Sequence, residues 1–172
     1  MSVTLILGGA RSGKSGRAEA LAEQSLLDVV YIATSPQMQD DSEWQRRIQK
    51  HQQGRPKHWQ TLEEPLDLCG ALNGLKSDQC ALVDCLTLWL FNIMSDGRNI
   101  ESETERLCTC LDKLDQQVFL VSNELGMGLV PEQKLGRDFR DAQGRLNQAV
   151  AKVASNVELV VAGIPMLLKE KL

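Results

Sequence analysis

A run of eight residues near the start of the sequence has the composition of a loop that binds nucleotide phosphates. The pattern G-x-x-x-x-G-K-[ST] is matched by Gly8-Gly9-Ala10-Arg11-Ser12-Gly13-Lys14-Ser15. Glycines let the backbone curl tightly, so that successive N–H groups point at a polyphosphate. We expect Lys14 to reach the β- and γ-phosphates and the Ser15 hydroxyl to bind Mg²⁺.

The segments on either side of this run have the patterns that such a loop requires. Residues 3–7 are apolar and rich in β-branched side chains, which predicts a buried strand. Residues 15–27 place small and apolar side chains at helical spacing, and the N-terminus of that helix adds partial positive charge for phosphate binding. The alternative is a glycine-rich turn that matches by chance, and the order strand, loop, helix makes it the weaker interpretation.

A carboxylate for the metal follows a second apolar run. Residues 80–84 predict a strand that ends in Asp84. Apolar residues leading into an aspartate are typical of a Walker B element, whose carboxylate holds Mg²⁺ directly or through water. This pattern is weak alone, but together with the phosphate loop it predicts Ser15 and Asp84 as Mg²⁺ ligands.

Polar residues also follow two other predicted strands. Residues 29–34 predict a strand whose end, Ala33 to Ser35, should lie on the same rim as the phosphate loop, because ligands bind beyond the carboxyl ends of parallel strands. Residues 118–122 predict another strand, followed by an Asn, a Glu and two glycines in residues 123–131. Ordinary connections are an equally good interpretation of both segments.

Basic residues gather around the two histidines of this otherwise acidic chain. His51 lies near the end of a predicted helix, residues 40–53, and His58 follows it; the basic residues around them are Arg46, Arg47, Lys50, Arg55 and Lys57. Anions are the natural partners of such a cluster. A solvated basic face, with one histidine packed against Trp44, explains the same residues more simply.

The whole sequence predicts one α/β domain, residues 1–172, with a mostly parallel sheet and flanking helices of the P-loop NTPase type. Its 172 residues suffice for one core, and the contents of 42% hydrophobic and 24% charged residues are ordinary for a globular protein. A fifth strand is predicted at residues 157–161, followed by a short tail. Further helices are predicted over residues 65–74, 86–94, 99–115 and 138–154.

Composition also argues against several classes of protein. A net charge of -4 disfavours a nucleic-acid surface, and no apolar run is long enough to span a membrane. The five cysteines include no C-x-x-C pair, and buried thiols in a reducing compartment are the expected state. The first strand begins almost at Met1, which leaves no room for a signal peptide, so we expect a cytoplasmic protein.

Three classes of phosphate-loop protein are compatible with the loop motif to different degrees. A GTPase switch is disfavoured because no D-x-x-G follows Asp84 and no N-K-x-D is present. A small-molecule kinase fits better, given the short chain and scattered arginines. A nucleotidyltransferase with a covalent histidine is the third class, and composition alone does not suggest it.

Five segments together closely resemble the bifunctional adenosylcobinamide kinase / adenosylcobinamide-phosphate guanylyltransferase family of cobalamin biosynthesis. The resemblance covers nearly the whole chain, in the same order along the sequence. Its segments are the phosphate loop, Tyr31-Ile32-Ala33-Thr34, Arg47-Ile48-Gln49-Lys50-His51-Gln52-Gln53-Gly54-Arg55-Pro56, Asn123-Glu124-Leu125-Gly126-Met127-Gly128-Leu129-Val130-Pro131 and Phe139-Arg140-Asp141-Ala142-Gln143-Gly144-Arg145-Leu146-Asn147-Gln148.

This resemblance implies two reactions. The family phosphorylates the aminopropanol hydroxyl of adenosylcobinamide, then transfers GMP from GTP onto that phosphate through a guanylylated histidine and releases pyrophosphate. The nucleophile corresponds to His51, whereas His58 is not in its place and is expected to be structural. A phosphate-loop kinase without guanylyltransferase activity remains the alternative.

The resemblance also implies the nucleotide contacts and the assembly. GTP is the expected nucleotide, with Mg²⁺, and ATP is a second candidate for the kinase step. Gln52 and Gln53 depart from the family pattern, so their contacts are expected through the backbone; Asp84 is a Glu in some relatives. The family forms trimers, and the apolar segment 86–94 is compatible with an interface. The implied GTP contacts are the phosphate loop, Ala33, Thr34, Ser35, Gln52, Gln53, Gly54, Arg55, Glu63 and Asp84.

Overall fold

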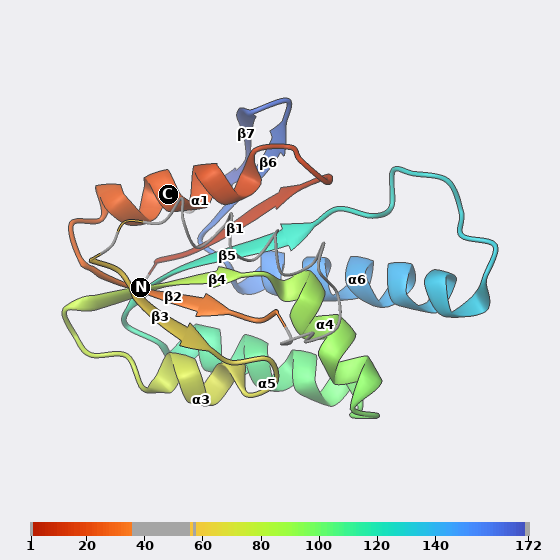
Figure 1. Ribbon diagram of the computed structural model, residues 1–172, viewed down its shortest axis with the longest axis horizontal. Helices are drawn as coiled ribbons and strands as arrows, with labels where there is room; N and C mark the ends of the chain where they lie inside the picture. The colour runs from red at the N-terminus through yellow and green to blue at the C-terminus, as the bar shows by residue number, and fades with distance from the viewer. Residues whose placement is uncertain (1, 36–55, 57, 171–172) are drawn as a thin grey trace.

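A seven-stranded sheet forms the centre of the computed structural model, which describes residues 2–35, 56 and 58–170. The strand order is β3-β2-β4-β5-β1-β6-β7, and each neighbouring pair is parallel except β6 with β7 (Figure 1). The strands are β1 (Ser2–Gly8), β2 (Asp28–Ala33), β3 (Gln60–Glu63), β4 (Gln79–Asp84), β5 (Gln117–Asn123), β6 (Asn156–Val161) and β7 (Ile164–Glu170). The predicted fold class, a mostly parallel sheet with flanking helices, is confirmed.

Helices cover the two faces of this sheet unequally. Among the described helices, α1 alone packs on one face, over a core that includes Ile6, Leu82 and Val160 (Figure 1). The others pack on the opposite face, around Leu5 and Leu90. The helices are α1 (Lys14–Gln24), α3 (Leu68–Asn73), α4 (Leu86–Ser95), α5 (Ile100–Lys113) and α6 (Lys134–Val153).

The central strands are buried on both faces, which explains their sequences. Leu5, Ile6, Leu82, Val83 and Leu120 are each 0% exposed. Parallel strands covered by helices on both sides are apolar at successive positions rather than at alternate ones. The strands therefore stand out in the sequence as continuous apolar runs, and the sheet holds their carboxyl ends rigidly along one edge.

Two strands at the margins of the sheet were not predicted from the sequence. All four residues of β3 are exposed, so the segment lacks the apolar run that marks a buried strand. The expected tail after β6 is instead the antiparallel strand β7, which contains Pro165. Proline is tolerated there because an edge strand needs fewer backbone donors. The prediction of five strands was therefore wrong by two at the edges of the sheet.

The helix boundaries also differ from expectation. The helix predicted from residue 65 begins at Leu68, where the Asp67 carboxylate accepts a hydrogen bond from the Gly70 N–H at 3.1 Å and caps the N-terminus. The last long helix begins at Lys134 rather than at residue 138. The helix predicted over residues 40–53 lies outside the described residues.

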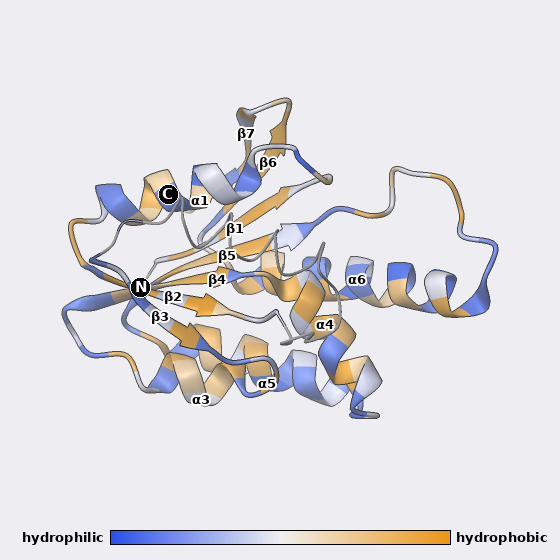
Figure 2. Cartoon of the chain, viewed as in Figure 1, coloured by the Kyte–Doolittle hydropathy of each residue, from blue (hydrophilic) through white to orange (hydrophobic). Residues whose placement is uncertain are grey.

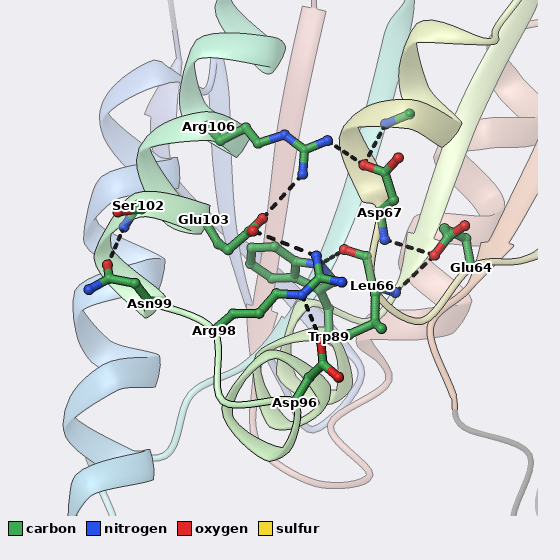
Figure 3. Close-up of polar contacts among 11 residues, drawn as sticks. Glu64, Leu66, Asp67, Trp89, Asp96, Arg98, Asn99, Ser102, Glu103 and Arg106 are labelled. Atoms are coloured by element: carbon green, nitrogen blue, oxygen red, sulfur yellow. Dashed lines mark hydrogen bonds and ion pairs between the residues drawn. The ribbon is translucent and has the colours of Figure 1, made fainter.

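A polar cluster fixes the turn that follows β3 (Figure 3). One oxygen of Glu64 accepts hydrogen bonds from the backbone N–H groups of Leu66 and Asp67 at 2.9 and 2.7 Å. The Asp67 carboxylate pairs with Arg106 of α5, and the Trp89 indole of α4 donates to the Leu66 carbonyl at 3.0 Å. The end of β3 is therefore tied to two helices on the same face of the sheet.

The apolar helix α4 is largely buried by the rest of the chain. Six of its residues are buried, and Phe91, which is 44% exposed, contacts Phe139 of α6 edge to face. The nearly all-apolar sequence of this segment predicts a buried helix, with cover by another subunit as the alternative. The prediction of a buried helix is confirmed, because α4 packs against α5, α6 and β5.

Candidate nucleotide site

The phosphate loop joins β1 to α1 and requires glycine at two of its positions. Gly13, just before α1, has a φ of 97°, which is in the left-handed region that side chains with a Cβ rarely adopt. A Cβ on Gly8 would lie 2.4 Å from the Ser12 Oγ and 2.7 Å from the Val160 carbonyl oxygen. The two glycines of the motif are thus fixed by backbone conformation and by close packing.

The polar side chains of the loop lie at the N-terminus of α1. Lys14 is the first residue of this helix, and its Nζ donates to the Gly9 carbonyl at 3.1 Å, so its ammonium lies over the loop. Ser15 is the second residue of the helix. The Ser12 Oγ is buried and has no hydrogen-bond partner among the described residues. A lysine, hydroxyl groups and helix N–H groups together favour a polyphosphate here.

The loop and its helix are anchored to β6, the strand next to β1. Arg17 of α1 donates two hydrogen bonds, each of 2.7 Å, to the Glu158 carboxylate on β6. This bonding raises the pKa of Arg17, so the guanidinium stays charged. The Gly163 N–H, in the turn between β6 and β7, donates to the Ser12 carbonyl at 2.7 Å. Both contacts restrict the loop from the β6 side.

A second group of predicted residues lies at the ends of β2, β3 and β4. Ala33 pairs in register with Glu63 on one side and with Asp84 on the other. Thr34 is 0% exposed, and its hydroxyl donates to the Cys85 carbonyl at 2.7 Å and accepts from the Cys85 N–H at 2.8 Å. Ala33, Thr34, Glu63 and Asp84 are therefore brought together.

The phosphate loop and this second group both lie at the edge of the sheet formed by the carboxyl ends of the strands, but at different strands. Strand β5 separates β4 from β1, so Asp84 is two strand spacings from the loop, about 10 Å. Glu63 is four spacings from it, about 19 Å. The edge thus offers a phosphate-binding end at β1 and a second polar end at β2 and β3.

The Asp84 carboxylate is held in place by one tyrosine. The Tyr31 hydroxyl donates to the Asp84 Oδ2 at 2.8 Å, which leaves the other oxygen for a ligand. No group of three or more His, Cys, Asp and Glu side chains that could hold a metal is found among the described residues. One hydroxyl and one carboxylate suit Mg²⁺, which takes most of its remaining oxygens from water and phosphate.

Two interactions that hold this edge were missed in the sequence. Asn92 is only 8% exposed within the apolar helix α4, and its amide donates to the Thr34 and Pro65 carbonyls at 2.8 and 3.0 Å. An Asn inside an otherwise apolar helix was the signal, because a buried amide needs partners. The Tyr31 contact with Asp84 left no such signal, since it depends on strand register.

The thiol next to Asp84 has an environment that disfavours a nucleophilic role. Burial, with a smaller contribution from Asp84, raises the pKa of Cys85 to about 11. The thiol therefore stays protonated near neutral pH, and a protonated thiol is a poor nucleophile. All five cysteines are free, as expected.

The predicted nucleophile belongs to the connection between two strands. His51 lies in the segment that joins β2 to β3, outside the described residues, as do Gln52, Gln53, Gly54 and Arg55. The segment leaves β2 beside Thr34 and therefore starts at the same edge as Asp84. Ser35 is the last described residue before it.

Comparison with known proteins identifies the family. Residues 4–168 match the model of the family "cobinamide kinase / cobinamide phosphate guanyltransferase". The chain belongs to this family. A bifunctional adenosylcobalamin biosynthesis protein, CobP of Pseudomonas aeruginosa, is 49% identical over 96% of both chains. The CobU protein of Escherichia coli with the same description is 40% identical over 96% of this chain and 98% of its own. The chain is thus an enzyme of the cobinamide kinase / guanyltransferase family of cobalamin biosynthesis.

Solved structures place the cobinamide kinase / guanyltransferase chain in the P-loop NTPase fold. An ATPase of a bacterial type III secretion system superimposes with a TM-score of 0.61 at 9% identity, covering 99% of this chain and 57% of its own. The RadB recombinase gives a TM-score of 0.52 at 15% identity, covering 92% of this chain and 73% of its own. At these identities the likeness concerns the fold alone. Among the described helices, none has the length and apolarity needed to cross a bilayer.

Proposed function

We propose that this chain phosphorylates the aminopropanol hydroxyl of adenosylcobinamide and then transfers GMP from GTP to the resulting phosphate. The second reaction passes through a guanylyl group on His51 and releases pyrophosphate. Family membership, with 49% identity to a bifunctional relative, is the observation that carries the proposal. The arrangement of the phosphate loop and Asp84 along one edge supports it.

Different described residues bind different parts of the nucleotide and its metal ion. Lys14 and the N–H groups of the loop bind the β- and γ-phosphates, and the Arg17 to Glu158 pair holds the helix behind them. Ser15 and Asp84 bind Mg²⁺, which neutralises negative charge on the phosphates. Ala33, Thr34, Ser35 and Glu63 bind the nucleotide further along the edge.

The proposed nucleophile is suited to two successive displacements. An imidazole must be neutral to attack the α-phosphorus of GTP, and an unperturbed histidine, with a pKa of about 6.5, is mostly neutral at pH 7.5. The basic residues that surround His51 in the sequence, Lys50 and Arg55, draw in the triphosphate. The Gln52, Gln53, Gly54 and Arg55 stretch contacts the nucleotide beside it.

The test is covalent labelling of the chain. The protein is incubated with Mg²⁺ and GTP labelled at the α-phosphate, denatured, and assayed for label that stays with the chain. Label that is acid-labile and base-stable, as a phosphoramidate is, supports the guanylyl-histidine. Absence of both label and pyrophosphate release would leave a phosphate-loop kinase without guanylyltransferase activity.

We also propose that the chain assembles as a homotrimer through the β6–β7 hairpin. Figure 2 shows hydrophobic residues along this hairpin, which forms the β7 margin of the sheet. Five of its apolar side chains are more than half exposed, and exposed apolar patches of this kind are typical of interfaces. They are Val161, Ile164, Met166, Leu167 and Leu168, with exposures of 51 to 67%.

Charges placed on the hairpin should break the trimer. Ile164→Glu with Leu168→Glu is expected to lower the mass measured by light scattering from three times the 19.1 kDa chain mass to the mass of one chain, because each new carboxylate must be desolvated at an interface. Leu26→Glu, at a position that is 93% exposed and away from the hairpin, is the matched control. A mass that the double variant does not change would rule out the hairpin as the interface.

A further inference from the structure

We propose that Asn123 is a catalytic residue of the phosphoryl-transfer step, whose side-chain amide donates a hydrogen bond to the γ-phosphate of the nucleotide on the phosphate loop. This inference rests on the kinase half of the proposed function and adds a residue to it. Four features of the structure support it: the place of β5 in the sheet, the direction of its side chains, the fixed backbone of Asn123 and its unpartnered amide.

Strand β5 lies between the two strands that carry the phosphate chemistry. Its neighbours are β1, which leads into the loop, and β4, which ends at Asp84. Asn123 is the last residue of β5 and pairs in register with Gly8, the first residue of the loop motif. The next residue, Glu124, donates its N–H to the Gly8 carbonyl at 3.1 Å. Asn123 is therefore one strand spacing, about 5 Å, from the start of the loop.

The alternation of side chains along β5 directs Asn123 toward the α1 face. Ser122 points to the opposite face, where its hydroxyl donates to the Asn147 Oδ1 of α6 at 2.7 Å. Successive side chains of a strand point to opposite faces. Asn123 therefore shares its face with Val121, which packs in the core beneath α1, the helix that follows the phosphate loop.

The backbone of Asn123 is fixed on both sides. Its N–H donates to the Thr87 Oγ1 of α4 at 2.9 Å, and its carbonyl accepts from the Asn147 Nδ2 at 3.0 Å. Asn147 is in turn held by Gln143, whose Nε2 donates to the Asn147 Oδ1 at 3.0 Å and to the Ser122 Oγ at 2.9 Å.

Burying the polar cluster of Ser122, Gln143 and Asn147 costs free energy. Ser122 and Gln143 are 0% exposed, Asn147 is 6% exposed, and the Gln143 Oε1 has no partner among the described residues. Burying polar groups costs free energy even when most of them are hydrogen-bonded. An apolar core would hold α6 to the sheet at lower cost. The cluster instead fixes the position of one residue at the catalytic edge.

The side-chain amide of Asn123 is available to a ligand. Both backbone groups of the residue are used, but its side chain makes no hydrogen bond to any residue that the structure describes. An Asn side chain offers two N–H donors and one carbonyl acceptor. At this edge of the sheet, beside Gly8, the ligand that accepts such donors is a phosphate oxygen.

The Asn123 amide stabilises negative charge that develops on the γ-phosphoryl group during its transfer. In the kinase step the substrate hydroxyl oxygen forms a bond to the γ-phosphorus, the bond from that phosphorus to the β–γ bridging oxygen breaks, and the nucleoside diphosphate leaves. The hydroxyl proton is released to water. Asn123 forms no covalent bond in this step; it donates to a non-bridging γ-oxygen, where negative charge is spread in the transition state.

The kinetic test compares Asn123→Ala and Asn123→Asp in the full chain. We expect each to lower the kcat of corrinoid phosphorylation about a hundredfold, with KM for the corrinoid within about threefold, because a donor to the transition state is lost. Asn123→Asp preserves the size and shape of the side chain, so a lower kcat in this variant would not reflect misfolding. Asn99→Ala, which removes the N-cap of α5 (Asn99 Oδ1 to Ser102 N–H, 2.8 Å), is a control for loss of stability remote from the edge. A kcat within threefold of the parent in both Asn123 variants would overturn the inference.

A binding test separates this inference from the proposed function. The affinities of α,β-methylene GTP and α,β-methylene GDP, which differ only in the γ-phosphate, are measured by calorimetry with Mg²⁺, and the adenine pair is measured in the same way. We expect the preference for triphosphate over diphosphate to fall about tenfold in Asn123→Ala. An unchanged preference overturns the role of Asn123. A parent chain that binds triphosphate through Asn123 but phosphorylates no corrinoid would refute the proposed substrate and leave this contact standing.

Discussion

Replacing His51 with alanine is expected to abolish guanylyl transfer and to leave corrinoid phosphorylation within about threefold of the parent rate. The reason is that covalent catalysis divides the transfer into two displacements, and without the imidazole nitrogen neither can occur by that route. The kinase step moves the γ-phosphate and uses the loop, the metal ligands, Asn123 and the hydroxyl of the substrate, and His51 takes no part in it.

The measurement follows both reactions in the same preparations. Label from α-labelled GTP is counted on the denatured chain, and phosphorylated corrinoid is quantified separately. His58→Ala is the matched control, because His58 is exposed and does not occupy the place of the nucleophile in the motif. Equal loss of both activities in a folded His51→Ala chain would contradict this division of labour.

Lys14→Ala is expected to lower both half-reactions by about a hundredfold or more. The Lys14 ammonium lies over the loop, 3.1 Å from the Gly9 carbonyl oxygen, and it is the charged donor at the start of α1. Its loss removes a positive charge from the site that both triphosphates use. Lys14→Arg is also expected to be poor, since a planar guanidinium does not replace a compact ammonium in a tight loop.

Titration of nucleotide affinity by calorimetry, beside both activity assays, checks this prediction. Lys134→Ala provides the control: Lys134 forms an exposed ion pair with Asp138 at 2.5 Å near the start of α6. Its removal should change neither activity. A Lys14→Ala chain that lost one activity and kept the other would indicate two separate nucleotide sites.

The sequence predicted the central strands of the sheet but not the outermost strands, β3 and β7, and one physical reason explains both outcomes. Strands β1, β4 and β5 are covered on both faces, and their sequences are therefore continuous apolar runs. Strand β3 is exposed at every residue, and β7 carries apolar side chains that the rest of the chain leaves exposed. Edge strands are held by backbone pairing with a neighbour, which leaves little trace in side-chain pattern.

The candidate site divides in a similar way. The phosphate loop is a contiguous run of eight residues, so the motif predicted it from the sequence alone. Contacts such as Tyr31 with Asp84 and Asn92 with Thr34 join residues more than fifty positions apart. They depend on which strands are neighbours and in which register, and no local pattern encodes that. The role of Asn123 likewise follows from strand order.

The turn between β6 and β7 touches the phosphate loop at two points. Gly163 donates to the Ser12 carbonyl, and a Cβ on Gly13 would lie 3.0 Å from the Gly163 Cα. The conformation of the loop is therefore coupled to that of the hairpin. A ligand that changes the loop conformation must either break this hydrogen bond or move the tip of the hairpin with the loop. Mechanical strain introduced at the tip of the hairpin would in the same way be transmitted to the backbone that holds the phosphates.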